Sequence, residues 1–196
     1  MRSLPDFHAA GFATALVDAP SDHPGDDGLA GFRIAEQHAD DLGKVIADVR
    51  TRTKGPVWVV GTSRGTISAV NAASRLTGTS AADGLVLTSA VTSGGTSRYR
   101  PWVTQTVFDL PLEAIRMPVL VVGHADDKCA RTPPAHMGEI TERTNGSREQ
   151  VVTVTGGPGS AAPGADVCEG RAPHGFIEQE TAVAAGIARF IRGGSY

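Results

Sequence analysis

Short, continuously apolar runs alternate along the chain with segments that place apolar residues three and four positions apart. Continuous runs are typical of strands buried on both faces of a sheet, and the second pattern is typical of amphipathic helices. The expected strands are residues 11–18, 56–60, 84–87, 118–122 and 151–154. The expected helices are residues 32–50, 66–76, 133–144 and 180–191. This alternation predicts an α/β fold of three layers with a mostly parallel sheet of about five strands.

Length and composition fit one soluble globular domain over residues 1–196. Hydrophobic residues make up 40% of the chain and charged residues 20%. The formal net charge of -3 argues against a dedicated nucleic-acid binder, which usually carries a basic excess. No apolar run is long enough to cross a membrane, and the first residues lack the apolar stretch of a signal peptide. No spacing of His, Asp and Glu is typical of a metal site, so we expect no metal and no cofactor.

One pentapeptide carries the pattern of a catalytic turn. Residues 61–65 read Gly-Thr-Ser-Arg-Gly, a G-x-S-x-G motif, between an expected strand and an expected helix. A nucleophile elbow needs this strand, tight turn and helix, with the central residue strained and its hydroxyl exposed. We interpret the two glycines as leaving room where strand and helix approach. A phosphate-binding loop is disfavoured because its lysine is missing.

A serine hydroxyl needs a base, and the base needs an orienting carboxylate. Asp126 and Asp127 follow the expected strand 118–122, and His174 precedes the last helix. Both places lie where parallel strands end, at the edge of the sheet that binds ligands. Ser63, Asp127 and His174 are therefore the expected catalytic residues, with Asp126 as the alternative carboxylate.

At these residues the chain resembles the α/β-hydrolase family, in particular bacterial serine esterases, over about residues 10–191. The resemblance rests on Gly-Thr-Ser-Arg-Gly, on the Asp-Asp pair after a strand and on His-Gly-Phe near the end. It implies that Ser63 is the nucleophile, Asp127 the acid and His174 the base. It also implies that the backbone N–H of Arg64 stabilises the oxyanion.

The chain departs from the family pattern at its front. The resemblance leads us to expect further strands before residue 11, and a loop that supplies a second oxyanion donor. Without them the strands 11–18 and 56–60 must pair directly, or a free edge allows a homodimer. The loop 20–28, with Ser21 and His23, is a candidate replacement wall for the oxyanion site.

Too few residues separate the expected strands 84–87 and 118–122 for a lid domain, so an open and shallow site is expected. Tyr99, Trp102 and Phe108 fall in this stretch. They are candidate walls for the acyl group, and simple core packing is an equal alternative. The substrate expected from this site is a small ester.

The two cysteines flank the expected acid and base. Cys129 lies two residues after Asp127, and Cys168 lies six before His174. A disulfide between them would tie the acid loop to the long loop before His174, whereas the alternative is two separate thiols. The absence of a signal peptide favours the cytoplasm, but a disulfide would favour an oxidising compartment.

The predicted function is that of a carboxylesterase that cleaves short-chain acyl esters through an acyl-enzyme. A non-catalytic member of the same fold that acts as a binding module is one alternative. An acyltransferase, thioesterase or peptidase with the same residues is another. No catalytic role is expected for the remaining histidines. We interpret His8, His23, His38 and His136 as surface residues and His124 as a structural residue.

Overall fold

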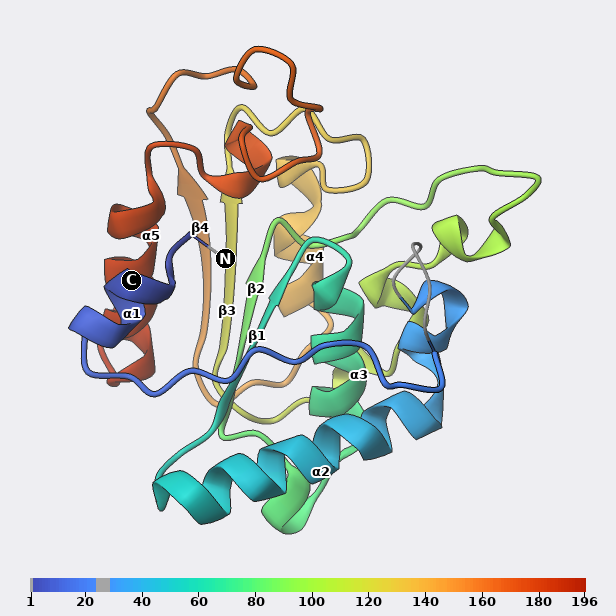
Figure 1. Cartoon of the computed structure of the whole chain (residues 1–196), viewed down its shortest axis with the longest axis vertical. Helices are drawn as coiled ribbons and strands as arrows, with labels where there is room; N and C mark the ends of the chain where they lie inside the picture. The colour runs from blue at the N-terminus through green and yellow to red at the C-terminus, as the bar shows by residue number, and fades with distance from the viewer. Residues whose placement is uncertain (1, 24–28) are drawn as a thin grey trace.

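A computed structural model describes residues 2–23 and 29–196 (Figure 1). Its centre is an open sheet of four parallel strands in the order β1-β2-β3-β4. The strands are β1 Trp58–Thr62, β2 Gly84–Thr88, β3 Val119–His124 and β4 Glu149–Val154. The predicted α/β class with a parallel sheet is confirmed, with one strand fewer than expected. In the described residues no helix is both long and apolar enough to span a membrane.

Helices cover both faces of the sheet (Figure 1). One face carries α2 Glu36–Thr53, α3 Gly65–Arg75 and α4 Met137–Thr141. The other carries α1 Leu4–Ala9 and α5 Glu180–Ile191. The expected helix 32–50 is split, since Ala30–Ile34 forms a 3₁₀ turn before α2. The expected helix 133–144 is shorter than predicted, because a 3₁₀ turn, Pro134–His136, precedes α4.

The core forms two layers, one on each side of the central strands. Every residue of β2 and β3 is buried. Successive strand residues point to opposite faces, so Leu85 and Leu87 pack toward α3 while Val86 packs toward α5. Continuous apolar strands are therefore the sequence mark of a sheet sandwiched between helices.

The predicted strand at 11–18 is wrong. This segment is extended but pairs with no strand, and Leu16 and Val17 are 64% and 54% exposed. The segment connects α1 on one face to α2 on the other (Figure 1), so its path is set by crossing between layers. An extended segment is not stabilised as a strand unless a neighbouring strand forms hydrogen bonds with it, even when its residues favour strands. Consequently β1 is an edge strand in the described chain, and the homodimer stays a prediction.

The two glycines of the 61–65 motif have different surroundings. A Cβ on Gly61 would lie 2.7 Å from the Gly65 carbonyl oxygen and 2.8 Å from Thr66 Cα, both backbone atoms. A Cβ on Gly65 would meet nothing within 4 Å. Only Gly61 therefore serves close approach of β1 to α3, and the prediction that both glycines leave room is corrected for Gly65.

Gly61→Ala should destabilise the protein by about 1–3 kcal/mol, because the added methyl overpacks against backbone that cannot move aside. Gly65→Ala is the matched control, and it should be neutral or stabilising by up to about 1 kcal/mol, since alanine favours a helix. Urea unfolding of both variants measures the difference. Equal losses of stability would contradict this description of the turn.

Candidate active site

Ser63 sits in a strained turn between β1 and α3. Its φ of 50° is left-handed, which is uncommon for a residue with a side chain. Its backbone N–H donates to the Thr88 carbonyl oxygen at 3.0 Å. Its own carbonyl accepts from the Thr66 N–H at 2.9 Å and from Thr66 Oγ1 at 2.6 Å. These bonds hold the backbone in the conformation that the nucleophile elbow requires.

Asp127 and His174 form a buried hydrogen-bonded pair. His174 Nδ1 lies 3.0 Å from Asp127 Oδ2, and the two residues are 3% and 6% exposed. Thr132 Oγ1 donates to the same Oδ2 at 2.8 Å, and the Cys129 N–H donates to Oδ1 at 2.9 Å. The alternative acid, Asp126, instead donates its backbone N–H to His124 Nδ1 at 3.0 Å. The geometry thus places Asp127, and not Asp126, against the histidine.

The partners of His174 decide which ring nitrogen carries its proton. A carboxylate accepts hydrogen bonds and donates none, so we assign the proton to Nδ1. Nε2 then carries a lone pair, and it is buried without a hydrogen-bond partner in the described residues. The same residues offer the Ser63 hydroxyl no hydrogen bond either. Contacts between nucleophile and base often tighten only when substrate binds, so this geometry suits a resting site.

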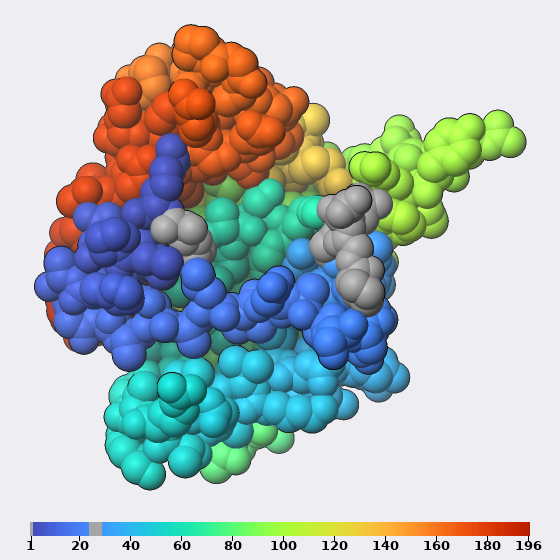
Figure 2. Space-filling view, viewed as in Figure 1, coloured from blue at the N-terminus to red at the C-terminus, as the bar shows by residue number. Residues whose placement is uncertain are grey.

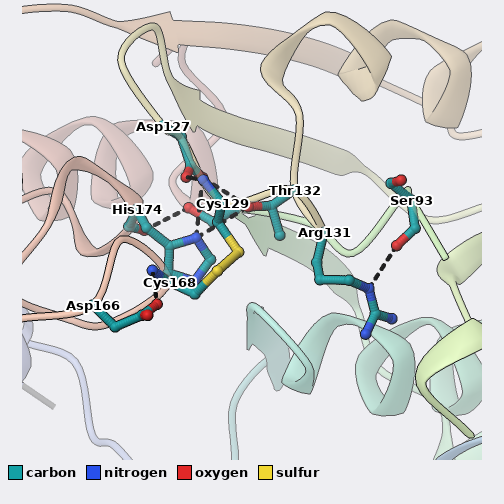
Figure 3. Close-up of a disulfide and its surroundings, with 9 residues drawn as sticks. Ser93, Asp127, Cys129, Arg131, Thr132, Asp166, Cys168 and His174 are labelled. Atoms are coloured by element: carbon teal, nitrogen blue, oxygen red, sulfur yellow. Dashed lines mark hydrogen bonds and ion pairs between the residues drawn. A yellow bond between two sulfur atoms is a disulfide. The ribbon is translucent and has the colours of Figure 1, made fainter. Parts of the chain in front are cut away.

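A disulfide joins the loops that carry the acid and the base (Figure 3). Cys129 is buried beside Asp127, whereas Cys168 is exposed in the long segment 155–172, which has no helix or strand. The Cys168 N–H donates to Asp166 Oδ1 at 2.8 Å, which fixes a local turn. The expected Cys129–Cys168 bridge is therefore present, and it anchors a segment that has few other constraints.

Two further residues position the site without any signal in the sequence pattern. Ser89 Oγ, just after β2, donates to the His174 carbonyl oxygen at 2.6 Å, while its neighbour Thr88 holds Ser63. The end of β2 therefore contacts the backbone of both Ser63 and His174. Thr132 lies 3.0 Å from His174 Nδ1 as well as bonding Asp127. A serine after a strand or a threonine in a loop is too common to be recognised from the sequence.

The predicted oxyanion donor is a backbone N–H at the end of the 61–65 turn. The backbone N–H of Arg64, at the start of α3, has no acceptor in the described residues and lies next to Ser63. The suggested second wall is partly outside those residues, since 24–28 are not described. Of the remainder, His23 stacks on Phe32 with ring centroids 3.7 Å apart.

His38 is not on the surface, contrary to the prediction. It is 3% exposed, and its ring nitrogens have no hydrogen-bond partner in the described chain. Burial, and after it the positive charge of Arg33, lowers the pKa of His38 to about 4. It therefore stays uncharged near neutral pH. His124 is buried, with Nε2 3.0 Å from the Gly156 carbonyl oxygen, which fits its structural interpretation.

The three aromatic residues proposed as acyl walls lie in different surroundings. Tyr99 is 86% exposed. Trp102 packs its Cβ near Gly31, and Phe108 packs against the core with the Arg143 guanidinium 4.3 Å from its ring centroid. Core packing therefore describes Phe108 better than substrate contact.

An apolar cavity of about 480 Å³ opens elsewhere, on the side of α1 and α5. It includes Thr62 and Gly175, the neighbours of Ser63 and His174 in the chain. Figure 2 shows a hollow between the orange surface of the loop before α5 and the blue N-terminal segment. Its apolar walls are Phe7, Val60, Phe176, Val183, Ala184 and Ile187.

Known proteins resemble this chain in fold and not in sequence. No protein-family model and no curated protein matches the sequence. Among solved structures, a monoacylglycerol lipase of Paleococcus ferrophilus matches with a TM-score of 0.52 at 14% identity, over 78% of this chain and 74% of that one. A structure described with two metagenome-derived lipolytic enzymes, LipS and LipT, matches with a TM-score of 0.54 at 13% identity, over 97% and 86%.

The fold is α/β-hydrolase-like. The strand, turn and helix that the motif predicts are present around Ser63, and its role as nucleophile stays a prediction. At this level of identity the likeness establishes the fold alone. Residues 2–23 and 29–196 contain no group of three or more side chains that could hold a metal ion.

Loss of the disulfide should lower kcat on the order of tenfold to a hundredfold, because a small displacement of the base slows the reaction strongly. It should also lower stability by about 4 kcal/mol in the chain-entropy model for the 39-residue separation. Ester turnover and unfolding are measured with and without dithiothreitol. A double variant, Cys129→Ser with Cys168→Ser, is the control, because reductant should not affect it. Full activity in this variant would contradict a positioning role.

Proposed function

We propose that the protein is a serine hydrolase that cleaves short-chain carboxylic esters. The observation that carries the proposal is the buried Asp127–His174 hydrogen bond, which leaves Nε2 of the histidine as a free acceptor. Activation of a serine hydroxyl requires an acceptor of this kind, and Ser63 in its strained elbow is the serine that we propose it activates. The lipolytic enzymes among the structural neighbours add support for ester hydrolysis.

In the proposed first half-reaction, Ser63 Oγ attacks the ester carbonyl carbon while its proton passes to His174 Nε2. The carbonyl oxygen becomes an oxyanion, which the Arg64 N–H and the N-terminal dipole of α3 stabilise. Asp127 keeps the imidazole oriented and stabilises the imidazolium. When the tetrahedral intermediate collapses, the carbon–oxygen bond breaks and His174 returns the proton to the leaving alcohol.

In the second half-reaction, water replaces the alcohol. His174 Nε2 takes a proton from water, and the hydroxide adds to the acyl carbon. Collapse then releases the carboxylic acid and restores the Ser63 hydroxyl. The same imidazole nitrogen therefore acts as the base in both halves.

The apolar cavity is the proposed site for the acyl group. It begins beside Thr62 and Gly175, so an acyl chain bound at Ser63 needs only to turn toward α5 to enter it. Val183 and Ile187 of α5 supply apolar walls. The proposal therefore moves the acyl group from the predicted aromatic walls to the opposite face of the sheet.

The test uses p-nitrophenyl esters from acetyl to palmitoyl on the wild type and on Ser63→Ala. The wild type should turn over the short esters best, and Ser63→Ala should lose roughly 1,000-fold or more in kcat, because no other group replaces the nucleophile. A fluorophosphonate probe should label the wild type and not Ser63→Ala.

Ser68→Ala is the control, since Ser68 lies in α3, five residues after Ser63, and its Oγ already accepts from Arg33 Nη1 at 2.7 Å. It should keep labelling and turnover. An unlabelled, inactive wild type would favour the alternative of a non-catalytic binding module with this fold. A preference for palmitoyl would contradict the short-chain proposal.

A further inference from the structure

Three arginines from distant parts of the chain converge on the start of α3. Arg64 directly follows Ser63, and its side chain is exposed. Arg33 Nη1 donates to Ser68 Oγ, in the first turn of α3, at 2.7 Å. Arg131 follows the acid loop and adjoins Thr132, which bonds the Asp127–His174 pair. Arginines from three segments thus lie around the helix start that follows Ser63.

Arg131 is held firmly but not neutralised. Its Nε donates to the Ser93 carbonyl oxygen at 2.6 Å, and its Nη2 donates to the Gln105 carbonyl oxygen at 2.9 Å. Figure 3 shows the side chain extending away from the disulfide toward Ser93. Carbonyl groups fix the direction of the guanidinium without cancelling its charge. Nη1 makes no further hydrogen bond within the described chain.

No ion pair among the described residues involves Arg64 or Arg131. The carboxylates that do form ion pairs are engaged elsewhere, for example Glu36 with Arg75 and Glu139 with Arg143. Two of the three guanidinium groups near Ser63 therefore keep their full charge in the described structure.

The charges are close enough to act on one another. Burial, and after it the positive charge of Arg64, lowers the pKa of Arg33 to about 10. The same two causes, in the same order, lower the pKa of Arg131. Like charges held together are unfavourable in the free protein, and an anion between them removes that repulsion. The arrangement is therefore complementary to a negative group that arrives with the substrate.

We propose that the preferred ester substrates carry a carboxylate or phosphate group, which Arg64 and Arg131 bind beside the reacting carbonyl. This inference rests on the proposed hydrolase function. The planar guanidinium donates two parallel hydrogen bonds to such groups, which an ammonium cannot reproduce. Arg131 supplies a preorganised charge, and the exposed Arg64 closes on the anion from the helix start.

Matched pairs of esters that differ only in charge test the inference. One pair is 4-acetoxybenzoate against methyl 4-acetoxybenzoate, with the charge in the leaving group. The other is mono-p-nitrophenyl adipate against its methyl ester, with the charge in the acyl chain. We expect kcat/KM to favour the anion by about tenfold or more in at least one pair at low salt, and the preference to shrink in high salt. The pair that shows the preference identifies the side of the substrate that carries the charge.

Variants assign the preference to residues. Arg64→Gln and Arg131→Gln should each lower the ratio of anionic to neutral turnover, and Arg64→Lys should keep only part of it, because an ammonium retains the charge but not the two parallel hydrogen bonds. The ratio compares two substrates on one protein, so a general loss of activity cancels. Arg189→Gln, on α5, removes the same charge away from the site and should leave the ratio unchanged.

Equal turnover within both pairs, with the neutral esters hydrolysed, would overturn this inference and leave the proposed function intact. A ratio unaffected by Arg64→Gln or by Arg131→Gln would overturn the assignment to that arginine. If the wild type hydrolyses no ester, the proposed function fails. Calorimetric titration with 4-hydroxybenzoate then shows whether the arginines bind an anion. Binding that Arg64→Gln abolishes would support the site, and no binding would overturn it.

Discussion

The hydrogen bond between His174 Nδ1 and Asp127 Oδ2 is the interaction on which the rest of the site depends. A buried carboxylate is tolerated only when its oxygens are satisfied, and three donors do this here: the imidazole, the Thr132 hydroxyl and the Cys129 N–H. The disulfide ties one of these donors to the segment that leads to the histidine. The same local network thus satisfies the Asp127 carboxylate, orients the His174 ring and fixes the intervening loop.

The sheet provides the frame for this pair. Parallel strands end at one edge, so the turns after β1 and β3 bring Ser63 and Asp127 to the same side of the molecule. The end of β2, between them, holds the backbone of Ser63 through Thr88 and that of His174 through Ser89. Ser63, Asp127 and His174, from three distant segments, are therefore placed by how their backbone follows or contacts the central strands.

Much of the fold was predictable because hydrophobic periodicity and residue composition within a short stretch favour one type of secondary structure. The buried strands β2 and β3 are recognisable as continuous apolar runs. The turn at Ser63 is recognisable because a short motif lies between an expected strand and an expected helix. The segment 11–18 shows where this reasoning fails, since an apolar run becomes a strand only if a neighbour pairs with it. The prediction that His38 is exposed is wrong for a related reason. Its burial depends on Phe32 and on the packing of α2, and not on its own sequence neighbours.

The sequence suggested the candidate reacting groups, whereas most of the residues that hold them in place left no signal in it. The order of serine, acid and histidine suggested Ser63, Asp127 and His174, and the closeness of Cys129 and Cys168 to them suggested the disulfide. Thr132, Ser89 and Arg131 depend on contacts between loops, which leave no periodic mark. The location of the apolar cavity on the α5 side likewise follows from how the helices pack on β1, which the sequence pattern does not specify.

Nitrogen-15 NMR of the histidine rings tests the central pair most directly. Near neutral pH the account predicts that His174 is the Nδ1–H tautomer, with a slowly exchanging Nδ1 proton that Asp127→Asn removes and Asp126→Asn leaves in place. The Nε2–H tautomer in the wild type, or a spectrum of His174 that Asp127→Asn leaves unchanged, would contradict it.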